Sequence, residues 1–227
     1  MTDISTQFDG QDPSFLLLNP LAREKGGDDL IFHWYTRCLT AKKAGKDVVN
    51  GTLGSLLDDS GHLAINNTVE NHIRNQPSVE LAGYAPLRGL PLFRDLAIEL
   101  ALGSNRQAIE NSGLSALSIA TPGGCGALSS AAANFVDGGD SILLRSSHWG
   151  PYKTIIRERG CEIATWPLLP ETPEAGLEHL DRGELASSLT KLAQEQKRVL
   201  IWLNDPAHNP TGLSLQSSER RAVMEEI

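Results

Sequence analysis

Apolar positions in the second half of the chain follow two different spacings. In PLFRDLAIELALG they recur at Leu92, Phe93, Leu96 and Leu100, which predicts an amphipathic helix that ends at Gly103. The runs SILLRS, CEIATWPL and RVLIWLND are short, apolar and bounded by polar residues, which predicts buried strands. LSALSIATP has the same character and predicts one more short strand that ends in a proline.

Helical segments are predicted between these strands. GALSSAAANFV, YKTIIRER and LASSLTKLAQEQK have helical composition and spacing, and SSERRAVMEEI begins a further helix. Strands that alternate with helices of this length need crossover connections, so we expect an α/β fold with a mostly parallel sheet covered on both faces. The strand at residues 198–203 is expected to be a central one.

The pattern is weaker before residue 90. Residues 1–15 are polar and predict a flexible arm, and residues 16–46 predict one or two helices. Four apolar residues there are expected to form a buried stripe: Phe32, Trp34, Tyr35 and Leu39. VVNGTLGSLL then predicts an extended segment broken by glycines, and DDSGH predicts a turn.

The composition narrows the class of protein. With 227 residues, 40% of them hydrophobic and 21% charged, the chain can bury a core. A net charge of −8 argues against nucleic acid or an anionic membrane as the main partner. Three scattered cysteines, Cys38, Cys125 and Cys161, fit a reducing compartment and include no CxxC pair. No signal peptide or membrane span is evident, so we expect a cytoplasmic protein without a metal site.

Three predicted strands end in loops of unusual composition: TPGGCG, RSSHWG and NDPAHNPTG. Ligands of such sheets bind beyond the carboxyl ends of the strands, so these loops are the candidate sites of chemistry. In TPGGCG, Gly123, Gly124 and Gly126 stand between a strand and a helix, where a phosphate could approach the helix N-terminus. A tight turn with close helix packing explains the glycines equally well. The loop matches neither GxxxxGK[ST] nor GxGxxG, which argues against a nucleotide-binding doubly wound domain.

Trp149 and Asn209 are the notable side chains of the other two loops. The indole could offer a flat face to an aromatic ring, or it could cover the edge of the core, and the neighbouring His148 is expected to be structural. Asn209 could donate a hydrogen bond to a phenolic or carboxylate oxygen, with Pro206 and Pro210 limiting the freedom of the loop. An ordinary turn also uses Asn, Pro, Thr and Gly, yet NDPAHNPTG is the most specific signal in the chain.

Together the three loops resemble one family, the class I aminotransferases of the aspartate and aromatic group, which are pyridoxal phosphate enzymes of fold type I. HNPTG resembles the family signature, TPGGCGAL its phosphate loop and SSHWGPYK its ring-stacking segment. GYAPLRGLPLFRDLA is similar to its tyrosine-containing stretch and NGTLGSLLDDSG to its glycine segment near the substrate. The order and spacing of all five agree from about Val48 onward.

The resemblance implies the cofactor pyridoxal 5'-phosphate and a set of residues that hold it. The residues that match the family's cofactor contacts are Gly123, Gly124 and Cys125 for the phosphate, Trp149 for the pyridine ring, Asn209 for the phenolic oxygen and Tyr84 for the phosphate of the neighbouring subunit. Tyr84 thereby implies a homodimer with shared active sites. The family commonly has Ser or Thr in place of Cys125, and a thiol is the weaker donor.

The resemblance also implies substrate contacts and a reaction. Gly54, Trp149 and Asn209 match positions that contact the substrate, and the family transfers an amino group from an amino acid to a 2-oxo acid. The implied domains are the N-terminal part of a small domain at residues 16–62 and a partial cofactor-binding large domain at residues 63–227. Which amino acid serves as substrate is left open.

The lysine that forms the Schiff base with the cofactor has no match here. All seven lysines precede Asn209, whereas the family's lysine follows the asparagine by several dozen residues, so it is expected beyond Ile227. No catalytic residue is therefore assigned, and the chain is expected to be the N-terminal half of the enzyme, inactive alone. Two alternatives stay open: another fold type I enzyme, such as a lyase or decarboxylase, and a non-catalytic truncated subunit or dimerisation module.

Overall fold

The computed structural model describes residues 17–19, 22, 30–52 and 54–227. The predicted arm at residues 1–15 lies outside these residues. The chain divides into two compact units, Met1–Gly83 and Tyr84–Ile227, which are described separately below. The domain boundary expected between residues 62 and 63 stays a prediction.

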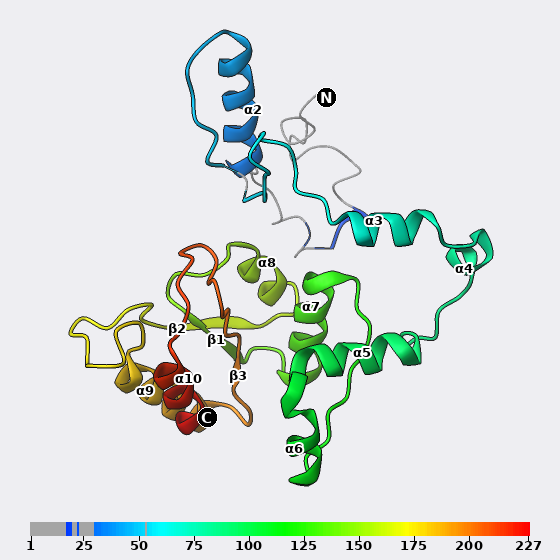
Figure 1. The fold of residues 1–227 in the computed structure, drawn as a ribbon. Helices are drawn as coiled ribbons and strands as arrows, with labels where there is room; N and C mark the ends of the chain where they lie inside the picture. The colour runs from blue at the N-terminus through cyan, green and yellow to red at the C-terminus, as the bar shows by residue number, and fades with distance from the viewer. Residues whose placement is uncertain (1–16, 20–21, 23–29, 53) are drawn as a thin grey trace. The chain divides into compact units, whose positions relative to one another are not determined.

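A sheet of three parallel strands lies in the second unit, in the order β2-β1-β3 (Figure 1). The strands are β1 Ser141–Arg145, β2 Glu162–Trp166 and β3 Leu200–Ile201. Ile142 of β1 lies opposite Ile163 of β2 and Leu200 of β3. The parallel sheet is confirmed. The expectation that the strand at residues 198–203 is central is wrong for this sheet, since β1 lies between β2 and β3.

Helices alternate with these strands as predicted. Those of the second unit are α5 Pro91–Leu102, the 3-10 helix η3 Gly103–Asn105, α6 Arg106–Asn111, α7 Gly123–Phe135, α8 Pro151–Arg157, α9 Arg182–Glu195 and α10 Ser217–Glu226. The predicted end of α5 at Gly103 is confirmed, because the positive φ of 52° there favours glycine over residues with a side chain.

The strand predicted for LSALSIATP is absent from the structure. Residues 114–121 are extended without a ladder partner in the described part of the chain. Their polar groups bond to α5 and to the loop before it: Arg94 Nε donates to the Ser118 carbonyl at 2.7 Å, and the Ala120 N–H donates to the Arg88 carbonyl at 3.0 Å. These bonds replace a strand ladder and hold the segment beside α5.

Two apolar clusters cover the two faces of the sheet. Ile142 and Leu144 of β1 point into a cluster with α7 and α8, which supply Ala132 and Ile156. Leu143 points the opposite way, into a cluster formed with α9, α10 and the loops beside them. All three β1 side chains are fully buried. Because successive strand residues face opposite sides, this alternation produces a three-layer arrangement, with α7 and α8 on one face and α9 and α10 on the other.

The first unit contains α2 Leu30–Lys43, α3 Asn67–Arg74 and α4 Ser78–Ala82. A helix within residues 16–46 is confirmed, but the buried stripe is wrong. Phe32 and Trp34 are 56% and 52% exposed, Leu39 is exposed and Tyr35 is half-buried. No described residue of the unit packs over them closely enough to bury them.

The predicted turn at DDSGH is confirmed in the first unit. Gly61 donates its N–H to the Asp58 carbonyl at 2.9 Å, and an antiparallel bridge joins Leu57 and Leu63. The Asp58 side chain also accepts the Ser60 and His62 N–H groups. Throughout the described residues, no helix has the length and apolar character needed to cross a membrane.

Candidate functional site

The carboxyl ends of β1 and β3 meet at one edge of the sheet, because the two strands are adjacent and parallel. β1 is followed by the loop that carries Trp149, and β3 by the loop that carries Asn209. This edge is where the sequence places its candidate site. The structure therefore brings these two predicted loops together.

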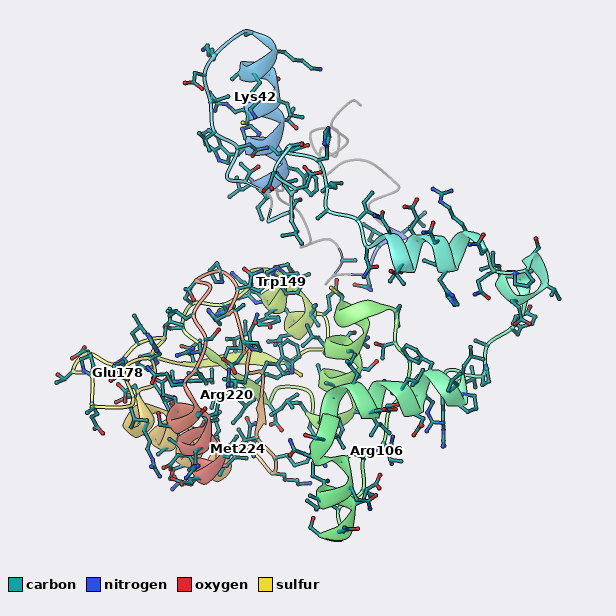
Figure 2. All side chains as sticks on the ribbon, viewed as in Figure 1. Lys42, Arg106, Trp149, Glu178, Arg220 and Met224 are labelled. Carbon is teal, nitrogen blue, oxygen red and sulfur yellow. The ribbon has the colours of Figure 1, made fainter. Side chains whose placement is uncertain are left out.

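Trp149 lies just before α8 and is half-buried (Figure 2). Its indole packs against the cluster on the α7 and α8 face of the sheet and meets the ring of Tyr152 edge-on, with centroids 5.5 Å apart. The Tyr152 hydroxyl accepts a hydrogen bond from Asn204 Nδ2 at 3.3 Å. Asn204 stands in the loop after β3, so one tyrosine connects the two loops.

The loop around Asn209 is held by its own backbone. The His208 N–H donates to the Leu213 carbonyl at 2.7 Å, and the Gly212 N–H donates to the His208 carbonyl at 2.6 Å. Ala207 has a positive φ of 54°, an unusual conformation for a residue with a side chain. The Asn209 side chain is exposed and makes no hydrogen bond with any residue that the structure describes, so its amide is available to a ligand.

Asp205 fixes this loop to α10. Its carboxylate accepts the Leu215 N–H at 2.7 Å and pairs with Arg220 Nε at 2.7 Å. Burial would raise the pKa of Asp205, but these two bonds and the charges of Arg220 and Arg145 outweigh burial and lower the pKa. The carboxylate is therefore ionised at neutral pH.

Two buried basic groups lie beneath the loops. Arg145, at the end of β1, donates to the carbonyls of Leu168 and His179, and burial lowers its pKa against the opposing charges of Glu219 and Asp205. His208 is 2% exposed and its Nδ1 lies 2.8 Å from Thr211 Oγ1. Burial and the charge of Arg145 lower the pKa of His208, although a hydrogen bond to the Ser147 backbone opposes them. His208 is thus neutral at physiological pH and serves as a support for the loop.

The first turn of α7 carries the other predicted residues. Gly123, Gly124 and Cys125 are exposed at its start, and the preceding Pro122 supplies no side-chain cap. By contrast, the Asp181 side chain caps α9. The Gly123 N–H donates to the Thr121 carbonyl at 2.7 Å. The N–H groups of Gly124 and Cys125 have no acceptor among the described residues and, with the helix dipole, favour an anion.

Close packing at this turn also explains one of its glycines. A Cβ at Gly126 would lie 2.6 Å from Pro122 Cδ, so a side chain there would displace the proline. Leu128, one turn further along α7, packs against the same cluster as Trp149. The early part of α7 thus shares a core with the Trp149 loop.

Gly54 and Tyr84 are the remaining predicted site residues. Gly54 belongs to the first unit, and Tyr84 is the first residue of the second unit with a fully exposed side chain. Their predicted contacts with substrate and with a partner's phosphate stay predictions. Sequence reasoning missed Tyr152, Asn204, Asp205 and Arg145, although Tyr152 stands only three residues after Trp149, within the segment SSHWGPYK.

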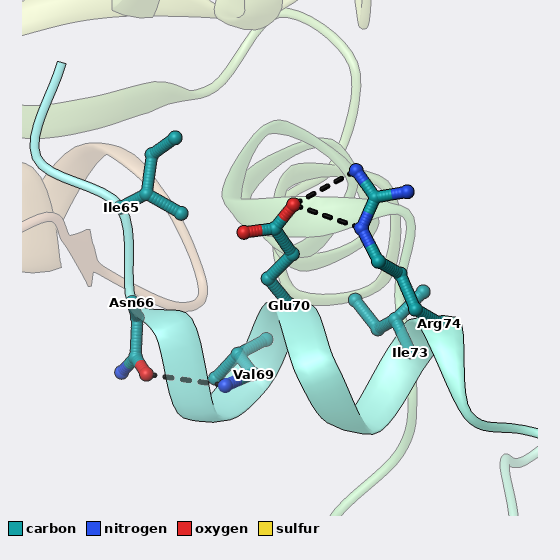
Figure 3. A pocket seen from close by; sticks show the side chains of 6 residues that line it. All are labelled: Ile65, Asn66, Val69, Glu70, Ile73 and Arg74. Carbon is teal, nitrogen blue, oxygen red and sulfur yellow. Dashed lines mark hydrogen bonds and ion pairs between the residues drawn. The ribbon is translucent and has the colours of Figure 1, made fainter.

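A separate hollow of about 460 Å³ lies on the first unit, beside α3 (Figure 3). Its lining is mostly apolar, from Ile65, Val69 and Ile73. The polar groups at its rim bond to one another: Glu70 pairs with Arg74 at 2.8 Å, and the Asn66 side chain caps α3 through the Val69 N–H. Two of its rim side chains are thus engaged in an ion pair, and a third caps the helix. The described residues also contain no cluster of His, Cys, Asp or Glu able to hold a metal ion.

Comparisons with known proteins give one family. The family described as aminotransferase class I and II matches residues 46–226. The mitochondrial aspartate aminotransferase of Schizosaccharomyces pombe is 31% identical over 133 residues, which cover 57% of this chain and 28% of that protein.

Solved structures agree with this match. An aminotransferase from Anaerococcus prevotii is 27% identical, with a TM-score of 0.80 over 92% of this chain and 49% of that one. The cytoplasmic aspartate aminotransferase of Saccharomyces cerevisiae, at 23% identity and a TM-score of 0.68, shares the fold over 88% of this chain and 47% of that one. The chain spans about half the length of these solved relatives.

Proposed function

The chain belongs to the class I and II aminotransferase family, and we propose that it forms the cofactor-binding half of a pyridoxal phosphate-dependent aminotransferase. The enzyme would transfer an amino group from an amino acid to a 2-oxo acid. One observation carries the proposal: the Trp149 loop and the Asn209 loop meet at one edge of a parallel sheet, joined by the hydrogen bond between Asn204 and Tyr152.

The residues of the three predicted loops fit the chemistry of pyridoxal phosphate. The uncapped N–H groups of Gly124 and Cys125 suit a phosphate dianion. The half-buried indole of Trp149 suits the pyridine ring, and the unbonded amide of Asn209 suits its phenolic oxygen. When bound, the cofactor supplies an electron sink for the substrate carbon that loses a proton.

The chain's own residues would bind and orient the cofactor and the substrate, and none of them would transfer a proton. His208 and Asp205 hold the loop that presents Asn209, and Pro206 and Pro210 limit its backbone freedom. The lysine that bonds covalently to the cofactor has no match among the seven lysines, which all precede Asn209. In the proposed enzyme this lysine, and the groups that grip substrate carboxylates, come from residues outside this chain.

The finer assignments belong to the same proposal. Gly54 would contact the substrate through its backbone, and Tyr84 would reach the phosphate held by a second copy in a homodimer. A cytoplasmic location is supported by the reduced state expected for the three cysteines.

The experiment that tests the proposal is a titration of the 227-residue chain with pyridoxal phosphate, followed by equilibrium dialysis. We expect saturable binding that inorganic phosphate competes away. Trp149→Ala should weaken binding about tenfold, the size of one aromatic contact of about 1.5 kcal/mol. Trp34→Ala, in the first unit, is the matched control and should bind as the unsubstituted chain does.

Two outcomes would refute the proposal. One is a chain that is folded by circular dichroism yet binds no pyridoxal phosphate, and the other is equal affinity in Trp149→Ala. Borohydride reduction should label no single lysine stoichiometrically, so a unique adduct at Lys153 would overturn the assignment of the covalent lysine elsewhere. Combined with a polypeptide that supplies the covalent lysine, the chain should transfer an amino group from an amino acid to a 2-oxo acid, measured over a panel of such pairs.

A further inference from the structure

Tyr152 occupies an unusual position in the candidate site. It lies in the first turn of α8 with only 8% of its surface exposed, and it contacts aromatic rings from two loops. Its ring centroid is 5.5 Å from that of Trp149 at an interplanar angle of 88°, and 5.2 Å from that of Trp202 at 63°. It also stacks on His148 at 6.3 Å. Perpendicular contacts of this kind favour one orientation of each ring.

The hydroxyl of Tyr152 makes a second connection. It accepts the side-chain N–H of Asn204 at 3.3 Å, across a separation of 52 residues in the chain. Asn204 directly precedes Asp205, whose carboxylate holds the Leu215 N–H and Arg220. The hydroxyl therefore bonds to the start of the loop that presents Asn209, while the ring bears on Trp149.

We propose that Tyr152 is a positioning residue of the cofactor site, acting on the indole of Trp149 through its ring and on the Asn209 loop through its hydroxyl and Asn204. The inference rests on the function proposed above. Tyr152 is assigned no contact with the cofactor itself. Its effect is to hold the Trp149 indole and the Asn209 amide in fixed positions relative to each other, so that both can contact the same pyridine ring.

The variant Tyr152→Phe separates this role from packing, because it removes the hydroxyl and keeps the ring. We expect pyridoxal phosphate to bind about three- to tenfold more weakly, the size of one lost hydrogen bond. Affinity for inorganic phosphate alone should be unchanged, because phosphate uses the first turn of α7. Tyr35→Phe is the matched control, since Tyr35 has a ring contact with Phe32 in the first unit. It should bind both ligands normally.

Asn204→Ala tests the partner of the hydroxyl. If the two residues act through their hydrogen bond, the double variant Tyr152→Phe with Asn204→Ala should bind pyridoxal phosphate about as weakly as either single variant. Losses that multiply would show independent effects and would overturn the proposed route from Tyr152 to the Asn209 loop. Thermal melts of each variant identify any general loss of stability.

A measurement without cofactor tests the orientation of Trp149 directly. The chain has four tryptophans, and 5-fluorotryptophan labelling gives each a fluorine resonance, with Trp149→Phe identifying that of Trp149. Tyr152→Leu, which removes the ring, should shift or broaden the Trp149 resonance and leave that of Trp34 unchanged, whereas Tyr152→Phe, which keeps the ring, should alter the Trp149 resonance less. If the Trp149 resonance and the affinity for pyridoxal phosphate are both unaltered in the Tyr152 variants, the inference about Tyr152 is wrong but the proposed function still stands. Absence of binding by the unsubstituted chain would instead refute the proposed function, and the inference with it.

Discussion

The two units of the chain both contain amphipathic helices but differ in burial. In the second unit, β1 lies between two apolar clusters, and Ile142, Leu143 and Leu144 are fully buried. In the first unit, no residue that the structure describes is buried. Its helix α3 has a clear apolar face, yet Val69 and Ile73 are 53% and 56% exposed. A periodic pattern thus marks a helix without ensuring that its apolar face is covered.

The difference follows from local connectivity. In the second unit α7, α8 and α9 are each joined to a strand by a short segment, so their apolar faces meet the sheet close to that strand in the sequence. The first unit has no strand of more than one bridged residue in its described part, so its helices have no sheet to cover. Hydrophobic burial therefore stabilises the second unit far more than the first.

Truncation of one isoleucine in each unit should show the largest contrast. Ile156→Ala removes a fully buried side chain of α8 and should lower the free energy of unfolding by about 2–5 kcal/mol. Ile73→Ala, on the exposed face of α3, should change it by less than about 0.5 kcal/mol. Urea unfolding followed by tryptophan fluorescence and by far-ultraviolet circular dichroism measures both. Equal losses in the two variants would contradict the comparison, because the burial difference would then have no energetic consequence.

Two aspartate–arginine pairs in the second unit allow a buried ion pair to be compared with an exposed one. The Asp205 side chain is 10% exposed in its pair with Arg220, whereas that of Asp137 is 60% exposed in its pair with Arg198. Asp205→Asn should cost about 1–3 kcal/mol, because it removes a charged partner from a buried network and loosens the Asn209 loop. Asp137→Asn should cost little, as solvent already screens that pair. Chemical unfolding compares them, and a greater loss in Asp137→Asn would reverse the argument.

Several elements of the fold were predictable from the sequence because their signals are local. SILLRS and CEIATWPL became β1 and β2, and Gly103 ended α5. The prediction for LSALSIATP was wrong because its hydrogen-bond partners are Arg88 and Arg94, which lie some two to three dozen residues earlier in the chain. RVLIWLND became a strand of only two residues. It lies on one side of β1 and not at the centre of the sheet, because the order of strands depends on the topology of the whole sheet.

The loop residues of the candidate site could be predicted from the sequence, but the buried residues that hold these loops in place could not. Glycines, an indole and an amide at strand ends are visible in the sequence, and the structure gathers the Trp149 and Asn209 loops as expected. Arg145 and Asp205 gave no signal, because a charged residue in a sequence does not reveal whether a distant partner will bury it. Arg145 bonds to carbonyls 23 and 34 residues away, a relation that only the folded chain defines.

Acidification should distinguish a buried histidine from an exposed one, with a smaller effect. Because burial and the charge of Arg145 lower the pKa of His208 in the folded chain, the unfolded chain binds that proton more readily. The free energy of unfolding should therefore fall as the pH decreases through the unfolded value of about 6.5 toward the lowered folded pKa. His208→Gln should reduce this slope in urea titrations between those limits. His62→Gln, at a side chain 80% exposed, controls for the effect of the substitution itself.

The smallest effect is expected where the second unit meets solvent, at the start of α7. Cys125→Ser replaces a weak thiol donor with a hydroxyl at an exposed position beside uncapped N–H groups. Affinity for inorganic phosphate and for pyridoxal phosphate should rise by about two- to fivefold, less than the contribution of one full hydrogen bond. Cys38→Ser, in α2 of the first unit, should leave both affinities unchanged. Isothermal titration calorimetry measures the change, and a gain for neither ligand, or an equal gain in Cys38→Ser, would remove Cys125 from the phosphate site. Because the substitution fills no cavity and breaks no buried contact, any gain would report on the ligand alone, with the folded core as an unchanged reference.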